Sequence, residues 1–494
     1  MNPTARLDHA HVWHPFTQMR DWLRTEPVVL VEGHGAVLRD IRGREYLDAN
    51  SSIWTNLHGH NHPKINAAIR AQLGRVAHTS SLGFANEPAS RLAAELVRIA
   101  APSRVGSQKT RTSNDRQLTK VFFSDDGSTA VEVALKLAYE FTRRTRGPKT
   151  QPRFLALKGA YHGDTVGAVS LGHIDLFHRA YSGLLFKSDA VMAPYCYRCP
   201  FNRAKPERAD ARSYRRCNWE CVTKVETALA KAAKRRNPYA GFIFEPRMQG
   251  AAGIIPQPDG WLQRVADLSR AHGALLIADE VMTGFGRTGT GPAHGRTAPE
   301  RGAITARSLF ACQHEGVLPD FLCVAKGLTG GYLPMAATLT TDAVFGAFLG
   351  EYSEFKSFFH GHSFTGNQLG AAASLASLKL LEPARAVAAR RNLEASLRAE
   401  LEQLWKLPQV GDIRQTGLVA GIELVRDWRT KESFVLADRA GIRVCEAMAR
   451  RGVLTRPIGN VLVLMPPYCT TSRQIAQMIG AMTESIAEVF PHAG

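Results

Sequence analysis

The chain has 494 residues, which is too long for one simple core and predicts two domains, or one large domain with an added lobe. Hydrophobic residues make up 45% of it and charged residues 21%, an ordinary balance for a soluble globular protein. No apolar run approaches the length of a membrane span, and residues 1–20 lack the apolar stretch of a signal peptide. We therefore expect a soluble, cytoplasmic protein without a membrane partner.

The formal net charge of +18 raises the question of a nucleic-acid partner. Much of the excess lies in four stretches that resemble insertions, at residues 104–120, 143–153, 198–216 and 231–236. The sequence contains neither helix-turn-helix spacing nor an aromatic RNA-binding motif. We interpret the charge as solvated basic loops and expect no nucleic-acid partner.

In chain order, the first predicted elements are short strands in residues 28–50, where glycines at the turns indicate a hairpin. From about residue 61 to 370, apolar strands alternate with segments of helical periodicity. The clearest strands are Val121–Phe123, Phe154–Leu157, Gly241–Phe244, Ala274–Ala278 and Phe321–Ala325. This alternation predicts an α/β fold with a largely parallel sheet that helices cover on both faces. Ligands bind such sheets at the carboxyl ends of the strands.

After Asn367 the sequence predicts a long helix, rich in alanine and leucine, that leads into an α+β lobe. The expected division has three parts. Residues 1–60 contribute to the small lobe and the active site, residues 61–369 form a large domain, and residues 370–494 form a small C-terminal domain. Three segments are interpreted as insertions into the large domain: 103–117, 196–221 and 291–308.

Eight cysteines in a chain of this length do not indicate a disulfide scaffold. Four of them cluster, as Cys196-x2-Cys199 and Cys217-x3-Cys221. Two close pairs separated by a loop resemble a structural zinc site, and four reduced surface cysteines are the alternative. Both interpretations stay open. A zinc site of four thiolates would be structural, because it leaves no open position for chemistry.

Two polar segments follow strands in the first half of the predicted sheet. The segment Asp126–Thr129 lies between a strand and a helix, where backbone N–H groups and the helix dipole can bind phosphate. An N-capping serine has the same pattern. The segment Tyr161–Asp164 follows the strand that ends at Leu157. Its tyrosine could stack on a planar ligand, and a turn with a half-buried tyrosine is the alternative.

Two charged residues end later strands. Asp279 follows five apolar or small residues, so its carboxylate is costly to bury without a partner such as a protonated ring nitrogen. A helix-capping carboxylate is the alternative. Lys326 follows another apolar strand, and we expect it to point into a cleft instead of lying on the surface. There desolvation lowers its pKa and frees a neutral amine that can form a Schiff base.

These segments occur in the order phosphate loop, aromatic residue, carboxylate and lysine, which is the set that pyridoxal phosphate needs. With them the chain resembles the class III aminotransferases, pyridoxal-phosphate enzymes of fold type I. That resemblance rests on the runs Ile277–Gly289 and Val324–Leu328. Within the family it looks like the branch that makes 7,8-diaminononanoate from 8-amino-7-oxononanoate in biotin synthesis. The closer resemblance rests on His14–Met19, Ser51–Trp54, Tyr161–Thr165, His360–Asn367, Arg456–Pro457 and Leu464–Tyr468.

The resemblance implies roles for residues around the cofactor, pyridoxal 5′-phosphate. Lys326 would form the Schiff base and carry a proton during catalysis. Asp279 would pair with the pyridine nitrogen, and Tyr161 would stack over the ring. The phosphate would be held by Gly127 and Ser128, together with the partner subunit's His362 and Ser363.

The resemblance also implies a substrate site at the interface of a homodimer. Arg456 would bind the far carboxylate of the oxononanoate, because a guanidinium grips a carboxylate with two parallel hydrogen bonds. The other residues expected to contact the small-molecule substrates are Phe16, Trp54, Tyr161, Asp164, Lys326 and Gly361.

The implied reaction is a transamination in two half-reactions at one site, which gives ping-pong kinetics. Phe16 stands where most members carry a tyrosine, and His362-Ser363 stand where most carry Pro-Thr. These variants resemble a minority branch that takes its nitrogen from lysine instead of S-adenosylmethionine. One lost hydroxyl hydrogen bond is worth only ~0.5–1.5 kcal/mol, so both donors stay open. The alternatives are another class III ω-aminotransferase, for ornithine, 4-aminobutyrate or a diamine, and a non-catalytic binding protein.

Overall fold

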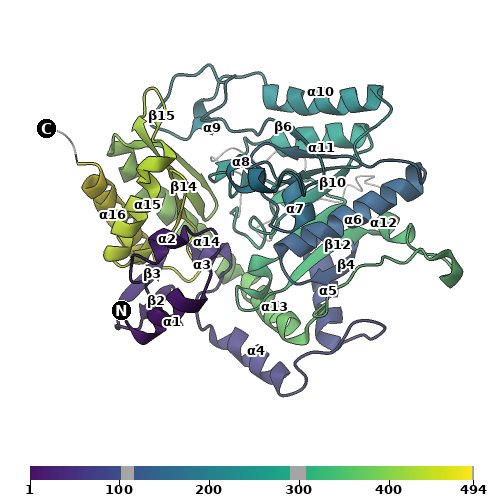
Figure 1. Ribbon diagram of the computed structural model, residues 1–494, viewed down its shortest axis with the longest axis horizontal. Helices are drawn as coiled ribbons and strands as arrows, with labels where there is room; N and C mark the ends of the chain where they lie inside the picture. Colours follow the sequence, from purple (N-terminus) through teal and green to yellow (C-terminus); the bar gives the residue numbers. More distant parts are fainter. Residues whose placement is uncertain (102–115, 290–307, 492–494) are drawn as a thin grey trace.

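The computed structural model describes residues 1–101, 116–289 and 308–491. Its centre is a seven-stranded sheet in the order β4-β12-β11-β10-β7-β5-β6 (Figure 1). The strands are β4 (Leu118–Ser124), β5 (Phe154–Leu157), β6 (Asp189–Val191), β7 (Gly241–Phe244), β10 (Leu275–Asp279), β11 (Phe321–Val324) and β12 (Ala336–Thr341). Each of the five strands expected from the sequence is present.

Most neighbouring strands of this sheet are parallel, which confirms the predicted α/β class. The pairs β6/β5, β5/β7, β7/β10 and β10/β11 are parallel. β12 is antiparallel to both β11 and β4, so β4 points the same way as β11. The carboxyl ends of all strands except β12 therefore meet at one edge, where ligands bind in sheets of this kind.

Helices cover both faces of the sheet, as the continuous burial of its central strands requires. On one face, Phe242 and Leu276 pack in the same buried cluster as Trp261 of α11 (Trp261–Ala271). On the other face, Ile243 and Ile277 pack with the apolar side of α6 (Gly127–Arg146). The further covering helices are α5 (Glu87–Ala100), α10 (Glu220–Lys234) and α13 (Gln368–Leu381), and α4 (Pro63–Leu73) packs on α13.

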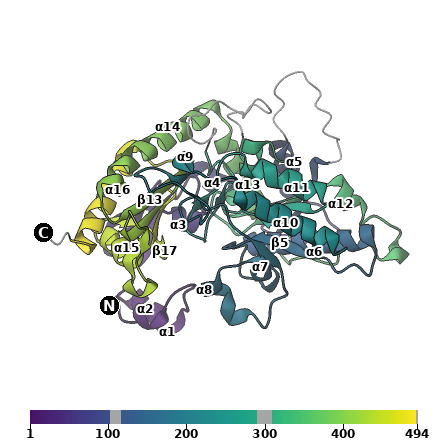
Figure 2. The ribbon, with the colours of Figure 1, turned by 90° about the horizontal axis from the view of Figure 1, so that it is seen from above.

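A second lobe combines elements from the first and last parts of the chain, drawn in purple and yellow at the left of Figures 1 and 2. Its first sheet has the order β1-β2-β3-β16, and β16 pairs parallel to β3. The hairpin predicted in residues 28–50 is therefore present and joins a C-terminal strand. Its second sheet has the order β13-β14-β18-β17, with β15 on β14. The elements are β1 (Leu30–His34), β2 (Val37–Asp40), β3 (Glu45–Asp48), β13 (Val410–Thr416), β14 (Val419–Asp427), β15 (Glu432–Ser433), β16 (Val453–Leu454), β17 (Pro457–Ile458), β18 (Val461–Leu464), α14 (Ala384–Leu401), α15 (Ala440–Arg450) and α16 (Ser472–Val489).

The single long helix expected after Asn367 is two helices, α13 and α14, with Pro383 between them. Proline has no N–H to donate and clashes with the preceding turn, so the first helix ends before it. α13 contacts α4 and α5, while α14 contacts α16 of the second lobe. The expected domain limits at residues 60 and 369 remain predictions. The expected insertions 103–117 and 291–308 lie almost entirely outside the described residues.

The remaining elements are short. They are α1 (Pro3–His11), α2 (Met19–Trp22), α3 (Ser51–Trp54), α7 (Val166–Leu171), α8 (Asp175–His178), η2 (Arg179–Tyr181), α9 (Ala211–Tyr214), β8 (Met248–Gln249), β9 (Ile255–Pro256), η4 (Ala311–Glu315), η5 (Lys326–Thr329), α12 (Asp342–Gly346), η6 (Tyr352–Glu354), η7 (Glu402–Lys406) and η8 (Leu436–Asp438). Among all the described helices, none combines the length and the apolar character needed to span a membrane.

Candidate active site

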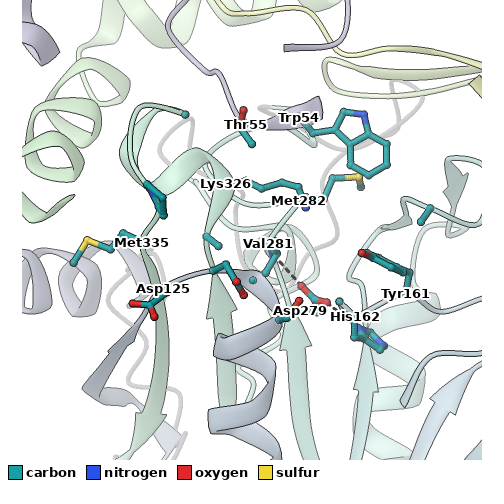
Figure 3. Close-up of a pocket in the computed structure, with 18 of the residues that line it drawn as sticks. Trp54, Thr55, Asp125, Tyr161, His162, Asp279, Val281, Met282, Lys326 and Met335 are labelled. Atoms are coloured by element: carbon teal, nitrogen blue, oxygen red, sulfur yellow. Dashed lines mark hydrogen bonds and ion pairs between the residues drawn. The ribbon is translucent and has the colours of Figure 1, made fainter. Parts of the chain in front are cut away.

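A pocket of about 450 Å³ lies at the carboxyl edge of the seven-stranded sheet (Figure 3). Five strands deliver residues to it: Ser128 after β4, Tyr161 after β5, Glu245 after β7, Asp279 at the end of β10 and Lys326 after β11. The opposite wall comes from Trp54 and Thr55 and from the loop Gly331–Met335. The topology thus gathers the phosphate loop, the aromatic residue, the carboxylate and the lysine that the sequence indicated.

Lys326 begins η5 one residue after the end of β11 and points its amine into the pocket (Figure 3). Its φ is 35°, a left-handed conformation that is strained for a residue with a side chain. Burial lowers the pKa of the amine, and the carboxylates of Asp279 and Glu245 oppose this effect. The amine nitrogen lies 5.7 Å from the centre of the Trp54 ring. The site therefore holds an enclosed lysine amine that is easier to deprotonate than one in water.

Asp279 is 5% exposed, and its carboxylate is held from two sides. Its Oδ2 lies 2.8 Å from Nδ1 of His162, and its Oδ1 accepts the N–H of Val281 at 3.1 Å (Figure 3). The side chain of His162 is fully buried. These contacts orient the carboxylate and offset part of the cost of its burial. It can receive a cationic N–H from a ligand in the pocket.

Tyr161 forms one side wall of the pocket (Figure 3). Its hydroxyl donates to Oδ2 of Asp164 at 2.6 Å. Burial, and then the hydrogen bond with Asp164, raise the pKa of the phenol above its ordinary value. The ring therefore stays neutral, and its orientation is fixed from outside the pocket, as stacking on a planar ligand requires.

The turn before α6 brings a helix N-terminus to the pocket. Asp126 caps the helix by accepting the N–H of Thr129 at 2.9 Å. A Cβ on Gly127 would lie 2.7 Å from Cγ1 of Val281, so glycine lets the helix start approach the end of β10 this closely. Ser128 Oγ accepts the N–H of Asp164 at 3.1 Å, which joins this turn to the tyrosine segment. Free N–H groups and the helix dipole favour an anion at such a position.

Six of the predicted site residues do not line this pocket: Phe16, Asp164, Gly361, His362, Ser363 and Arg456. Asp164 acts through Tyr161. Phe16 packs on Phe177 with ring centres 5.2 Å apart, and Phe177 packs on Tyr161 at 6.3 Å. Nδ1 of His362 lies 3.4 Å from Oδ2 of Asp125, a pocket residue of the same chain. Arg456 is exposed and has no ion-pair partner in the described part of the chain.

Two buried residues of the site received no role from the sequence. His162 stood inside a quoted motif, but nothing in the pattern indicated its contact with Asp279. Glu245 follows the fully buried strand β7 and is 6% exposed. The sequence could have identified Glu245 as a site residue, because a carboxylate directly after an apolar strand is the pattern that identified Asp279.

The four clustered cysteines, Cys196, Cys199, Cys217 and Cys221, are free thiols. Burial raises the pKa of Cys196 to about 12 and that of Cys221 to about 11, so both keep their protons at neutral pH. Throughout the described ranges, no group of three or more histidine, cysteine, aspartate or glutamate side chains is arranged to hold a metal ion. The zinc interpretation therefore has no support in the structure.

The cysteine-bearing segment instead attaches the large sheet to the second lobe. Arg212 donates to the main-chain oxygen of Gln415 at 2.6 Å and to Oγ1 of Thr416 at 3.1 Å. Arg198 donates to the buried carboxylate of Glu423 at 2.6 Å. These two basic residues of the segment thus have structural partners in β13 and β14.

Comparison with known proteins places these features in one family. The family model described as "Aminotransferase class-III" matches residues 19–486. The chain is 45% identical over 482 residues to the adenosylmethionine-8-amino-7-oxononanoate aminotransferase of Geobacter sulfurreducens, covering 98% of this chain and 97% of that one. The crystal structure of the protein of that name from Methanocaldococcus jannaschii is similar with a TM-score of 0.84 at 38% identity, covering 98% of both chains. A PLP-bound amine transaminase from an uncultivated Pseudomonas species has a TM-score of 0.82 at 30% identity, covering 97% and 99%.

Proposed function

Because the chain belongs to the class-III aminotransferases, we propose that it converts 8-amino-7-oxononanoate to 7,8-diaminononanoate in biotin synthesis. The observation that carries the proposal is the pocket that places Lys326 opposite the Asp279–His162 pair, in a chain similar to enzymes of that name over nearly its whole length. The proposed location is the cytoplasm.

Pyridoxal 5′-phosphate is the cofactor, and the residues present fit it. The glycine at position 127 keeps the start of α6 within van der Waals distance of β10, which leaves the helix N-terminus open to a phosphate. Asp279 is the carboxylate for the ring nitrogen, and Tyr161 is the flat wall for the ring face. When bound, the cofactor accepts an amino group and delocalises the electrons released when a carbon loses its proton.

The protein's own residues then control charge and protons. Lys326 carries the amine whose pKa burial lowers, so its nitrogen can bind a carbonyl carbon and can later hold or release a proton. Asp279 would hold the ring nitrogen by accepting its N–H, which favours the positively charged form of the ring. His162 is a positioning residue, because its ring nitrogen orients the carboxylate of Asp279.

The oxononanoate carboxylate is assigned to Arg456, as the sequence resemblance implies. Support comes from its state in the structure, where the guanidinium is exposed and has no ion-pair partner within the described residues. A carboxylate can therefore take both of its parallel N–H donors. Trp54, which lines the pocket, is assigned to the same substrate, with Phe16, Asp164 and Gly361.

A second copy of the chain is proposed to complete the site, supplying the partner subunit's His362 and Ser363. Support comes from two loops that join at the surface. His78 lies 2.8 Å from the main-chain oxygen of Ser363, and its ring packs against Phe364. Large apolar side chains on these loops are exposed, in the single chain: Leu82, Phe84, Phe359 and Phe364. Such a patch marks a protein interface.

The proposed amino donor is S-adenosylmethionine, which the names of the relatives print. Lysine is the second candidate, because Phe16 and His362-Ser363 follow the pattern of the lysine-using branch. Incubating the enzyme with the oxononanoate and each donor separately tests both. Formation of diaminononanoate with either donor supports the proposal, and no product with either contradicts it. Activity on ornithine, 4-aminobutyrate or a diamine alone would assign the chain to another branch of the family.

A further inference from the structure

A second buried carboxyl group, that of Glu245, lies beside Asp279 in the active site. Phe244 of β7 pairs with Ala278 of β10 in parallel register, so the residues that follow them, Glu245 and Asp279, occupy equivalent positions on neighbouring strands. Both line the pocket that contains Lys326. The transamination chemistry described above uses Asp279 and leaves Glu245 without a role.

The contacts of Glu245 include no cation. Its Oε2 accepts the N–H of Gly250 at 2.7 Å, and its Oε1 accepts the N–H of Tyr161 at the longer distance of 3.4 Å. No salt bridge to Glu245 exists in the described portion of the molecule. A carboxylate that is buried with only main-chain donors is costly for the fold. Burial accordingly raises the pKa of Glu245 to about 7.

The ionisable groups around Glu245 come from three elements. The segment after β5 contributes His162, whose charge would favour the carboxylate, and β10 contributes Asp279, whose charge opposes it. The phenol of Tyr161 donates to Asp164, away from Glu245. The third element, η5, contributes Lys326. The carboxylates of Asp279 and Glu245 both favour its protonated amine and so oppose the effect of burial.

We propose that Glu245 is a charge-setting residue of the aminotransferase, which together with Asp279 supplies the negative charge that lets the enclosed amine of Lys326 take up a proton as well as release it. Burial alone favours the neutral amine. A transaminase lysine needs both forms, since the amine that binds a carbonyl carbon must later carry a proton. Glu245 is a positioning residue in this account, because it acts through Lys326.

A purely structural role is the competing explanation, and a glutamine distinguishes it. In Glu245→Gln the side-chain oxygen can still accept the N–H of Gly250, but the group cannot ionise. Glu280 provides a matched control. It is also fully buried with its pKa raised to about 7, but its carboxylate accepts the N–H groups of Ala311 and Cys312 at 2.6 and 2.8 Å, and it does not line the pocket.

The direct test measures the titration of Lys326 in the full-length protein freed of cofactor. Competitive acetylation at a series of pH values, followed by mass spectrometry of the peptide that contains Lys326, reports the fraction of neutral amine. E245Q should lower the pKa of Lys326 by on the order of one pH unit, which is about a tenfold rise in neutral amine at a fixed pH. E280Q should leave the titration where it is in the native protein. An unchanged Lys326 titration in E245Q, or equal shifts in both variants, would overturn the proposal.

A second readout uses the cofactor-loaded enzyme. The pH at which its visible absorption changes should fall in E245Q and return toward the native value in Glu245→Asp, which restores the charge. If E245Q does not fold, Glu245→Ala carries the test. It also removes the charge, so the shift of Lys326 should have the same sign as in E245Q. A Lys326 titration identical to the native one would then contradict the proposal. The Lys326 titration is measured without substrate. The proposal for Glu245 can therefore be refuted while the proposed oxononanoate reaction stands, and that reaction can be refuted while the proposal for Glu245 stands.

Discussion

Replacing Gly127 with alanine tests how closely the start of α6 must approach the end of β10. The new Cβ would lie 2.7 Å from Cγ1 of Val281 and 3.1 Å from Cγ2. Carbon atoms in contact normally lie about 3.5–4.0 Å apart, so the gap is short by roughly 1 Å. Valine is branched at Cβ and stiff about χ1, and both of its methyl groups face the new atom, so rotation cannot relieve the clash. The helix start and the strand end must separate.

Overpacking by one methyl group of this kind costs about 1–3 kcal/mol, and we expect the free energy of unfolding of the cofactor-free protein to fall by that amount. The separation of the start of α6 from the end of β10 also displaces the helix N-terminus that is proposed to hold the phosphate. Binding of pyridoxal phosphate should weaken by about tenfold for each 1.4 kcal/mol of lost contact.

Urea unfolding of the cofactor-free protein and titration with pyridoxal phosphate measure the two effects. Gly480→Ala is the matched control, because a Cβ there meets nothing within 4 Å in helix α16, and it should be neutral or stabilising by up to about 1 kcal/mol. The double variant Gly127→Ala/Val281→Ala should recover part of the loss, with a coupling energy of about 0.5–3 kcal/mol. Native stability and native cofactor affinity in G127A, or strict additivity in the double variant, would refute the reasoning.

Three further changes test other parts of the account. Arg456→Ala should raise the KM for the oxononanoate by about 10- to 100-fold with little change in the KM for the amino donor, since charged hydrogen bonds are worth about 1.5–3 kcal/mol; an unchanged KM removes Arg456 from the carboxylate role. Burial lowers the pKa of His58 to about 3 from 6.5, so the folded state binds fewer protons than the unfolded state between these values and stability falls as pH falls. Between pH 7 and pH 5, the free energy of unfolding of His58→Gln should therefore fall by about 2 kcal/mol less than that of the native protein. Urea unfolding measures both, and equal falls would contradict this. Phe364→Glu should shift the sedimentation coefficient from dimer to monomer, whereas Leu176→Glu, at an exposed position on α8, should not; a dimeric F364E would exclude this patch from the interface.

Much of the fold was predictable because its strands are short, apolar and buried on both faces. A polar residue directly follows each of the five quoted strands at the same edge of the sheet, so Asp279 and Lys326 could be identified from their own segments. The break at Pro383 was also readable from the sequence, since proline cannot continue a helix, but the alanine-rich composition on both sides led to one predicted helix instead of two.

Contacts between distant segments could not be predicted in the same way. His162 and Asp279 are 117 positions apart, and only the strand order β10-β7-β5 within the sheet brings their side chains to 2.8 Å. Phe177 connects Phe16 to Tyr161 through ring packing that no periodicity indicates. The cysteine spacing resembled a zinc site, but spacing fixes ligand types and not the approach of four sulfur atoms, and within the described residues no group of three or more histidine, cysteine, aspartate or glutamate side chains is arranged to hold a metal ion.

The most direct test of the central claim is to find the lysine that binds the cofactor. Reducing the purified enzyme with borohydride in the presence of pyridoxal phosphate and mapping the peptides by mass spectrometry should place the added mass on Lys326, with none in Lys326→Ala. Modification of another lysine in the native enzyme, or no stable modification at all, would contradict the account.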